Sequence, residues 1–433
     1  MPDTVSSLLR AALGIGVFLG ACWLMSENRR KINWRLVAGG MGLQFVLAIL
    51  ILRVPLVERA FDAVARFFVE LLGFRREGAV FLFGDLVERT DTFGFIFAFQ
   101  VLPTIVFFAA FSSVLYYVGI LQRVVFAFAW LMKRTMRLSG AESLATAANI
   151  FVGQTEAPLV VRPYLAGMSR SEIMTLMAGG MATIAGGVLV SYIGMLGGDD
   201  PEARLLFARH LLTASILSAP AAIVAAKMMV PETRVVIETL ELPRERMGSN
   251  LLDAATIGMA DGVKLAVNVA GALLVFTALV ALVNFVLREW VGGWSGLNAG
   301  IAALTGGRYD AFSLQFVLGV LFAPAAWLVG VAPQDVLGVG QLLGERMVLN
   351  EFFAYATLAD MKAAGIIGDP RSVMIATYAL CGFANIVSMG IQVGGIGALA
   401  PEQRSTLAAL AFRAMLAGTF ACLLTASTAA FLV

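Results

Sequence analysis

The sequence has very few of the residues that build metal centres and disulfide frameworks. Histidine occurs once, as His210, and cysteine three times, as Cys22, Cys381 and Cys422, far apart within apolar stretches. This spacing excludes a zinc site, a disulfide framework and a histidine-based metal site. A single histidine also argues against a histidine proton relay, so we interpret His210 as a hydrogen-bonded helix residue.

Charged residues are scarce as well. They make up 14% of the chain, against about a quarter in soluble domains, while hydrophobic residues make up 59% and the mean hydropathy is +0.86. This composition leaves too little polar surface to cover a water-facing globule. It excludes a soluble enzyme, a nucleic-acid binder and a disordered regulator. The long apolar runs do not alternate as barrel strands do, so we expect an all-α polytopic membrane protein surrounded by lipid.

Eight apolar runs are long enough to cross a bilayer core, which needs about 20 residues per helix. The first run could be mistaken for a signal peptide, or for a lipoprotein cleavage box at Leu19–Cys22, but it continues to Met25 and predicts a retained helix. The predicted spans are roughly 8–25, 34–52, 93–120, 172–197, 205–230, 262–288, 372–398 and 405–433.

Basic residues set the expected orientation. Four of them lie between positions 26 and 35, and four more between 123 and 137, which predicts that both segments are cytoplasmic. The acidic loop 197–202 then lies outside and the polar stretch 227–250 inside. Eight crossings place both termini outside.

Two segments, 139–168 and 333–362, are too polar for simple crossings, and each has room for two half-membrane helices. They predict re-entrant hairpins. Trp130 precedes Glu156 by 26 residues, and Trp327 precedes Glu351 by 24, and a glycine-interrupted helix follows each hairpin. The first hairpin would enter from inside and the second from outside. Such an inverted repeat places a binding site at the middle of the membrane.

Glu156 is the most informative single residue. It lies in Gln154-Thr155-Glu156-Ala157-Pro158, between two apolar stretches, and a carboxylate in the bilayer costs a few kcal/mol unless it is paired or hydrated. Pro158 would leave neighbouring peptide groups free to bind a ligand. The alternative, a short cytoplasmic loop, fits the apolar flanks less well.

Three further sites carry polar groups inside apolar runs. Glu351 follows Asn350, Asn385 and Ser388 are spaced to share one helix face, and Thr183 lies close to a glycine pair. Each also has a structural explanation: a glutamate that reaches the surface, hydrogen bonds between helices, or close packing. The charges Arg162, Asp261 and Lys264 are assigned structural roles, with Asp261 and Lys264 neutralising each other.

The candidate groups are carboxylates, amides and hydroxyls, without clustered arginine or lysine. They favour a ligand that is uncharged or cationic and rich in hydroxyls and ring nitrogens. A carboxylate can accept hydrogen bonds from a vicinal diol, amides can donate to and accept from a heterocycle, and Phe383 can lie against a planar base.

Three segments carry a resemblance to a known family. They are Gly153-Gln154-Thr155-Glu156-Ala157-Pro158, the stretch from Gly344 to Tyr355 that contains Asn350-Glu351-Phe352, and Cys381-Gly382-Phe383-Ala384-Asn385. In this order the chain resembles a bacterial, sodium-coupled concentrative nucleoside transporter. Arg346 replaces the lysine of the family signature and Phe353 its valine, and both departures leave Asn350 and Glu351 intact.

The resemblance implies a homotrimer with two functional parts and no cofactor. Residues 1–120, with an interfacial segment, and 251–290 would form a scaffold, and residues 121–250 and 310–433 a transport domain. Gln154, Thr155, Glu156 and Val188 would face the nucleobase, Glu351, Asn385 and Ser388 would hold the ribose, and Phe383 would pack beside them. Sodium would bind the side chains of Asn149 and Thr183 and the carbonyls of Val152 and Ile184, because oxygen ligands suit a hard cation.

The implied function is secondary active symport of nucleosides such as uridine, cytidine or adenosine, by elevator-like alternating access in the bacterial inner membrane. The chain is then not an enzyme. Three alternatives remain from the sequence: a proton-coupled nucleoside symporter, an intramembrane enzyme that uses a carboxylate pair, and a channel. The preference between purines and pyrimidines stays open.

Overall fold

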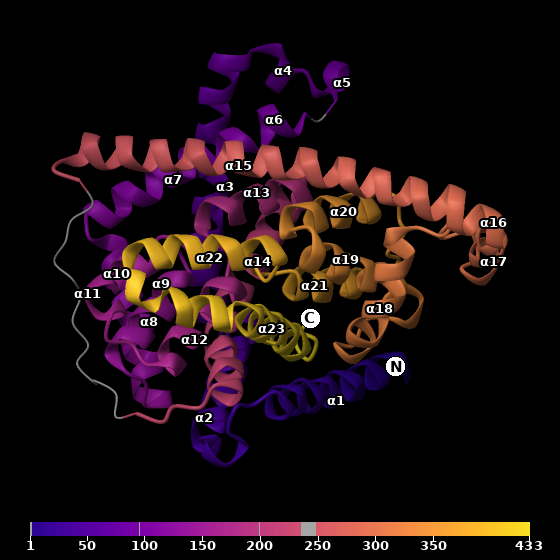
Figure 1. The fold of residues 1–433 in the computed structure, drawn as a ribbon. Helices are drawn as coiled ribbons and strands as arrows, with labels where there is room; N and C mark the ends of the chain where they lie inside the picture. The colour runs from indigo at the N-terminus through magenta and orange to yellow at the C-terminus, as the bar shows by residue number, and fades with distance from the viewer. Residues whose placement is uncertain (1, 95, 199, 235–247) are drawn as a thin grey trace.

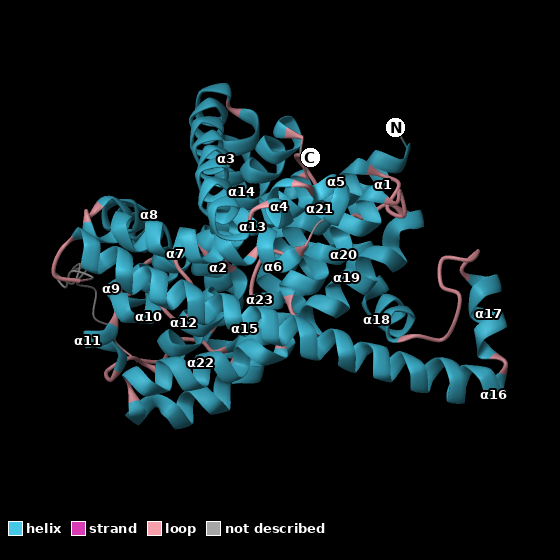
Figure 2. Ribbon diagram, turned by 90° about the horizontal axis from the view of Figure 1, so that it is seen from above, coloured by secondary structure: helices cyan, strands magenta, loops and turns pink. Residues whose placement is uncertain are grey.

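The computed structural model describes residues 2–94, 96–198, 200–234 and 248–433, and these residues form helices and no strand (Figures 1 and 2). The all-α prediction is therefore confirmed. Part of the polar stretch predicted at 227–250, namely 235–247, lies outside the described residues.

The N-terminal region contains two apolar helices followed by an amphipathic one. α1 (Pro2–Leu24) and α2 (Trp34–Arg53) are each apolar enough to span a membrane. α3 (Pro55–Phe83) has 29 residues with charges throughout its first three quarters, so it fits the expected interfacial segment rather than a crossing. The short helices α4 (Asp85–Glu88), α5 (Thr90–Phe93) and α6 (Phe97–Gln100) lead into α7 (Leu102–Tyr117).

Among the described residues, seven stretches are long and apolar enough to cross a membrane, and they match seven of the predicted runs. The remaining predicted run, 372–398, is the seventh along the chain, and it is divided between α21 (Pro370–Ala379) and α22 (Ile386–Leu399). The fourth is also interrupted, because three residues separate α12 (Arg170–Ala182) from α13 (Gly186–Gly197). The glycine interruptions in the sequence thus mark real breaks in both helices.

The two breaks lie against each other, and Gly382 makes this possible. Its φ is +122°, and a Cβ atom at this position would stand 2.6 Å from the carbonyl oxygen of Met181 and 2.8 Å from that of Ala182. Any side chain would collide with the end of α12. The non-helical segments 183–185 and 380–385 therefore meet in the interior of the protein.

Each repeat begins with a helix and a hairpin. α8 (Ile120–Met136) precedes α9 (Gly140–Asn149), α10 (Ala157–Val160) and α11 (Arg162–Leu165). α18 (Leu314–Leu328) precedes α19 (Val336–Val348) and α20 (Glu351–Ala363). The first hairpin has an extended tip between Asn149 and Ala157, while the second turns sharply at Leu349 and Asn350. The predicted inverted repeat is confirmed, with one open tip and one tight tip.

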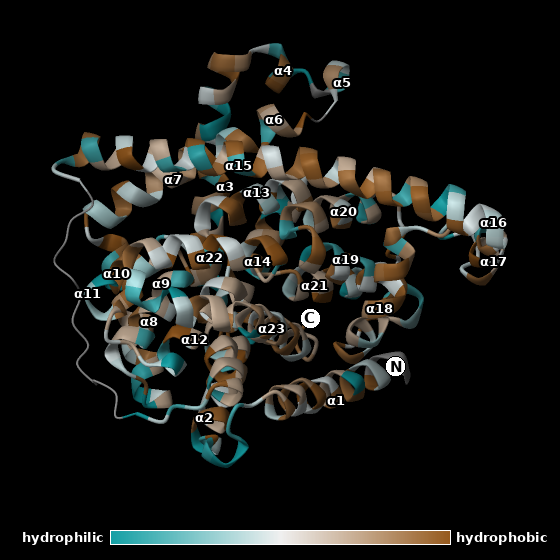
Figure 3. Cartoon of the chain, viewed as in Figure 1, coloured by the Kyte–Doolittle hydropathy of each residue, from teal (hydrophilic) through white to brown (hydrophobic). Residues whose placement is uncertain are grey.

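Burial divides the helices into a centre and an edge. In the apolar segment of α14 (Pro201–Met229) all residues are buried, whereas in the apolar segment that begins with α15 (Leu251–Phe285) only 6% of the residues are buried. α15 packs along α7 and continues through the π-helical stretch Val286–Gly292 to α16 (Gly293–Ser295) and α17 (Leu297–Leu304). Apolar residues are spread along its length (Figure 3). α23 (Arg404–Ala429) packs against α12 and α14.

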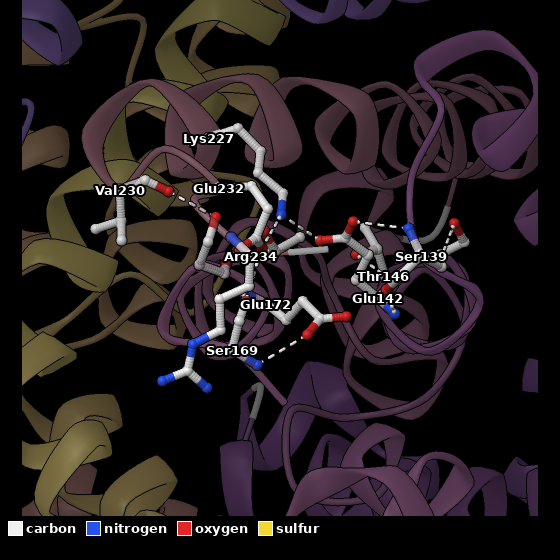
Figure 4. A network of polar contacts seen from close by, with 12 residues as sticks. Ser139, Glu142, Thr146, Ser169, Glu172, Lys227, Val230, Glu232 and Arg234 are labelled. Atoms are coloured by element: carbon white, nitrogen blue, oxygen red, sulfur yellow. Dashed lines mark hydrogen bonds and ion pairs between the residues drawn. The ribbon is translucent and has the colours of Figure 1, made fainter. Parts of the chain in front are cut away.

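A buried ion-pair network joins the ends of three helices (Figure 4). Lys227 of α14 lies 2.7 Å from a Glu142 carboxylate oxygen at the start of α9 and 3.4 Å from Glu232. Ser169, which caps α12, donates to Glu232 at 2.6 Å. Because Glu142 also takes part in the capping box of α9, the network fixes the base of the first hairpin to α12 and α14.

Two structural assignments from the sequence are confirmed. His210 is buried and its Nδ1 lies 2.9 Å from the Tyr378 hydroxyl. Lys264 lies 3.4 Å from Asp261 as an exposed pair.

Candidate functional site

A continuous chain of hydrogen bonds joins the two hairpins. The amide nitrogen of Gln154, at the tip of the first hairpin, donates to the hydroxyl of Ser388 on α22 at 3.1 Å. The backbone N–H of Ser388 donates to Asn385 Oδ1 at 2.8 Å. Asn385 Nδ2 in turn donates to Glu351 Oε2, on the second hairpin, at 2.8 Å. All three predicted ribose residues and one predicted base residue are thus brought together.

Helix termini explain the positions of Glu351 and Asn385. Glu351 is the first residue of α20 and Asn385 caps α22, so both lie at helix N-termini. The partial positive charge of such termini favours the Glu351 carboxylate, which is only 5% exposed. Tyr192 of α13 packs against Phe352, the residue that follows Glu351, with the ring centroids 5.0 Å apart. This carboxylate keeps acceptor capacity for a ligand.

Glu156 faces a different space. One of its carboxylate oxygens is buried without a hydrogen-bond partner among the described residues. A Cβ atom on Gly153 would stand 2.1 Å from this oxygen, so any other residue at position 153 would displace the Glu156 carboxylate. Glu156 lines a cavity of about 240 Å³ between the first hairpin and the helices α7, α13 and α15. Val188, also predicted at the base site, lines the same cavity. The described hydrogen bonds do not join Glu156 directly to Glu351.

Thr155 and Phe383 flank the hydrogen-bonded chain. A Cβ atom on Gly395 of α22 would stand 3.4 Å from Thr155 Cγ2, and Thr155 is exposed. Phe383 lies in the break between α21 and α22 with 9% of its surface exposed. A flat apolar side chain beside exposed polar groups suits a planar ring with polar edges.

The predicted sodium ligands surround the break between α12 and α13. Asn149 ends α9, is 1% exposed, and neither its amide nitrogen nor its amide oxygen has a partner among the described residues. A buried amide without partners costs free energy, so it marks a place where an ion or water belongs. Thr183 and Ile184 lie in the break itself and Val152 in the hairpin tip. The Gly186 N–H donates to the Phe151 carbonyl at 3.0 Å, which holds the hairpin tip against the start of α13.

Residues that the sequence did not single out complete the site. Ser215 of α14 donates to the Ile150 carbonyl at 3.0 Å and accepts from the Ile184 N–H at 3.4 Å, which ties the hairpin tip to the broken helix. Gln392 of α22 and Tyr192 of α13 are two further residues that the sequence analysis did not single out. Gln392 lies one helical turn after Ser388, so the spacing of polar residues on α22 was the available signal.

The described residues include no group of three or more His, Cys, Asp or Glu side chains placed to hold a metal ion. Amide, hydroxyl and carbonyl oxygens are the groups around Asn149 instead. Such neutral oxygen ligands are compatible with a weakly bound hard monovalent cation.

Opposed re-entrant hairpins, two interrupted helices and polar groups at their breaks are the features of a secondary transporter. The comparisons agree with this class. Residues 210–430 match the family described as Na+ dependent nucleoside transporter C-terminus, and residues 13–86 match its N-terminus. Residues 98–199 match the family described as nucleoside recognition. The chain belongs to the concentrative, sodium-dependent nucleoside transporter family.

Relatives support this assignment over nearly the whole chain. An "Uncharacterized transporter" of Haemophilus influenzae is 39% identical, and the match covers 98% of this chain and 97% of that protein. "Sodium/nucleoside cotransporter 1" of Rattus norvegicus is 38% identical, with 97% and 63% covered. "Solute carrier family 28 member 3" of Mus musculus is 39% identical, with 97% and 58% covered. The chain thus spans about three fifths of the length of these mammalian relatives.

Solved structures give the same result. The structure of CNTnw in an inward-facing substrate-bound state is 36% identical with a TM-score of 0.87, and the match covers 98% of both chains. A CNTnw variant in the intermediate 2 state is 36% identical with a TM-score of 0.89 and the same coverage. The relatives are transporters, so the chain is not an intramembrane enzyme.

Proposed function

We propose that this protein takes up nucleosides by symport with sodium. The observation that carries the proposal is the hydrogen-bond chain from Glu351 to Gln154. This chain links both hairpins through the start of α22 and leaves acceptors for a ligand. Glu351, Asn385 and Ser388 would hold the ribose. Gln154, Thr155, Glu156 and Val188 would face the base, with Phe383 packed against it.

The sodium ion is proposed to bind at Asn149. Its unpaired amide oxygen would join the Thr183 hydroxyl and the carbonyls of Val152 and Ile184. Sodium would order the tip of the first hairpin and so prepare Gln154 and Glu156 for the base. One sodium ion and a neutral nucleoside carry one charge, which supplies about 2.3 kcal/mol per 100 mV. That energy alone supports roughly fifty-fold accumulation.

The transport step is proposed to be an elevator-like movement. Residues 121–250 and 310–433, with both hairpins, would move across a scaffold of 1–120 and 251–290. The apolar outer surface of α15 would face lipid or neighbouring copies in a homotrimer. The site would lie in a bacterial inner membrane, with both termini outside.

Uptake into proteoliposomes tests the proposal. Radiolabelled uridine should accumulate when a sodium gradient is imposed, and an inward negative potential should increase the accumulation. The same vesicles in sodium-free buffer over a pH series provide the control for proton coupling. Accumulation that follows pH without sodium would replace sodium by protons, and the absence of saturable uptake of any nucleoside would reject the transport function.

Glu27 allows a test of the proposed domain boundary. It lies in the loop between α1 and α2, and its carboxylate binds Arg170 at the start of α12 at 2.9 Å and Arg413 of α23 at 2.6 Å. The bond from Arg170 holds the pKa of Glu27 below its ordinary value. The pairs are therefore complete at neutral pH, and they are lost only as the pH falls through this lowered pKa.

We expect Glu27→Gln to speed departure from this conformation up to about fivefold, because exposed ion pairs contribute up to about 1 kcal/mol. The nucleoside KM should stay unchanged. Single-molecule distances between labels on α2 and α12 would measure the rate at neutral pH. Arg89→Gln is the control, since it removes an ion pair with Asp85 that stays within one segment. Equal rates in wild type and Glu27→Gln would contradict the boundary.

A further inference from the structure

Gln392 is fully buried on α22, next to the proposed base site. Its amide nitrogen donates to the backbone carbonyl of Met177 on α12 at 3.0 Å and to Gln154 Oε1 at 3.0 Å. Because a backbone carbonyl can only accept hydrogen bonds, the Met177 bond identifies the Gln392 atom that faces it as nitrogen. The orientation of the Gln392 amide is thus fixed by the main chain.

This orientation determines the orientation of Gln154. The Gln392 nitrogen requires an acceptor, so Gln154 must turn its oxygen toward Gln392 and its nitrogen toward Ser388. One N–H of Gln154 is used by the Ser388 hydroxyl, and the other is available to a ligand. A second main-chain anchor, the Ser388 N–H on Asn385 Oδ1, fixes the rest of the chain in the same way.

The packing leaves little freedom for another arrangement. A Cβ atom on Gly180 of α12 would stand 2.8 Å from the Gln392 nitrogen and 2.9 Å from Gln154 Cβ. The same atom would stand 3.4 Å from Asn149 Oδ1. Gly180 therefore allows the hairpin tip, α12 and α22 to meet at one point, where the proposed sodium and base sites adjoin.

We propose that Gln392 is a positioning residue that sets the donor and acceptor polarity of the base site. Through Gln154 it presents an N–H donor, while Glu156 presents a carboxylate acceptor. The site would then select bases that carry a hydrogen-bond acceptor beside an N–H donor, as in uracil, cytosine and adenine. Gln392 itself is buried and does not touch the substrate. This inference rests on the proposed nucleoside transport.

The test is a double-mutant cycle with uridine uptake as the readout. Gln392→Met keeps the volume and removes both donors, so it should raise the uridine KM about tenfold while the maximal rate and the sodium dependence change less than twofold. In a Gln154→Ala background the same substitution should raise KM less than twofold further, because it acts only through Gln154.

Gln44→Met is the matched control. Gln44 is also fully buried, and its amide nitrogen donates to the Leu217 carbonyl at 3.2 Å and to the Thr425 hydroxyl at 3.0 Å, neither of which belongs to the proposed base or ribose residues. Its loss should leave the uridine KM within twofold of wild type. An equal KM rise in Gln44→Met, or a full tenfold rise from Gln392→Met in the Gln154→Ala background, would overturn the proposal.

A second variant keeps the test decisive if Gln392→Met does not fold. Gln154→Glu still accepts from Gln392 but has no N–H for the base, so its uridine KM should rise at least as much as in Gln154→Ala. A KM within twofold of wild type would show that the base needs no donor there and would overturn the proposal. Failure of nucleoside transport itself would appear separately, as absent uptake by the wild-type protein.

Discussion

Replacing Glu351 by glutamine is expected to weaken ribonucleoside binding at least a hundredfold and to stop sodium-driven uptake. Asn385 already donates to Glu351 Oε2, and the main-chain N–H of Ser388 fixes the orientation of Asn385. Glutamine would have to turn its single oxygen toward Asn385 and its nitrogen toward the ribose. Two charge-assisted hydrogen bonds to the diol, worth about 1.5–3 kcal/mol each, would be lost.

Deoxynucleosides test whether the affinity lost in Glu351→Gln comes from hydrogen bonds to the ribose hydroxyls. For the wild-type protein, 2′-deoxyuridine and 3′-deoxyuridine should bind more weakly than uridine, whereas Glu351→Gln should hardly distinguish the three. Binding to purified protein by calorimetry would measure this. Glu345→Gln is the control, because Glu345 is a buried carboxylate of the same hairpin that binds Gln341 instead of the site. Uridine affinity within threefold of wild type in Glu351→Gln would remove this residue from the ribose site.

The sequence was sufficient to find the hairpins and the main polar residues because polar groups in the bilayer are costly. A carboxylate such as Glu156 or Glu351 is easily recognised between apolar runs. A segment that is too polar to cross the membrane as a single helix is equally easy to recognise. The glycine interruptions likewise predicted the breaks. What they did not show is that Gly382 joins the two breaks, since a close approach of residues 200 positions apart leaves no local pattern.

Single neutral residues on long helices could not be assigned from the sequence. Gln392, Ser215 and Tyr192 occupy helices whose other residues are mostly apolar, and a lone amide or hydroxyl there looks the same whether it joins two helices or supports a binding site. The distinction needs the partner atoms, such as Met177 O and Gln154 Oε1 for Gln392. The amphipathic α3 was likewise anticipated only as an interfacial segment within 1–120.

Replacing Asn149 by alanine is expected to raise the sodium concentration for half-maximal uptake at least tenfold. The Asn149 amide is buried and unpaired among the described residues, so its oxygen is available to a cation and costs stability without one. Its loss would leave the Thr183 hydroxyl and two backbone carbonyls as proposed ligands. Because the ion would order the hairpin tip that holds Gln154 and Glu156, the uridine KM at low sodium should rise as well.

Thr146→Ala provides the matched control for this prediction. Thr146 is buried on the same helix, and both Thr146 and Asn149 pack against Gly179, but its hydroxyl already donates to the Glu142 carbonyl at 2.8 Å. Uptake measured over a sodium titration should therefore show an unchanged midpoint in Thr146→Ala and a shifted one in Asn149→Ala. Saturating sodium should restore much of the uridine affinity in Asn149→Ala, because mass action can offset a weakened ion site. Among the described residues near the hairpin tip, Asn149 is the one amide that is buried and unpaired at both of its polar atoms. An unchanged sodium midpoint in Asn149→Ala would therefore show that the coupling ion does not bind at this amide.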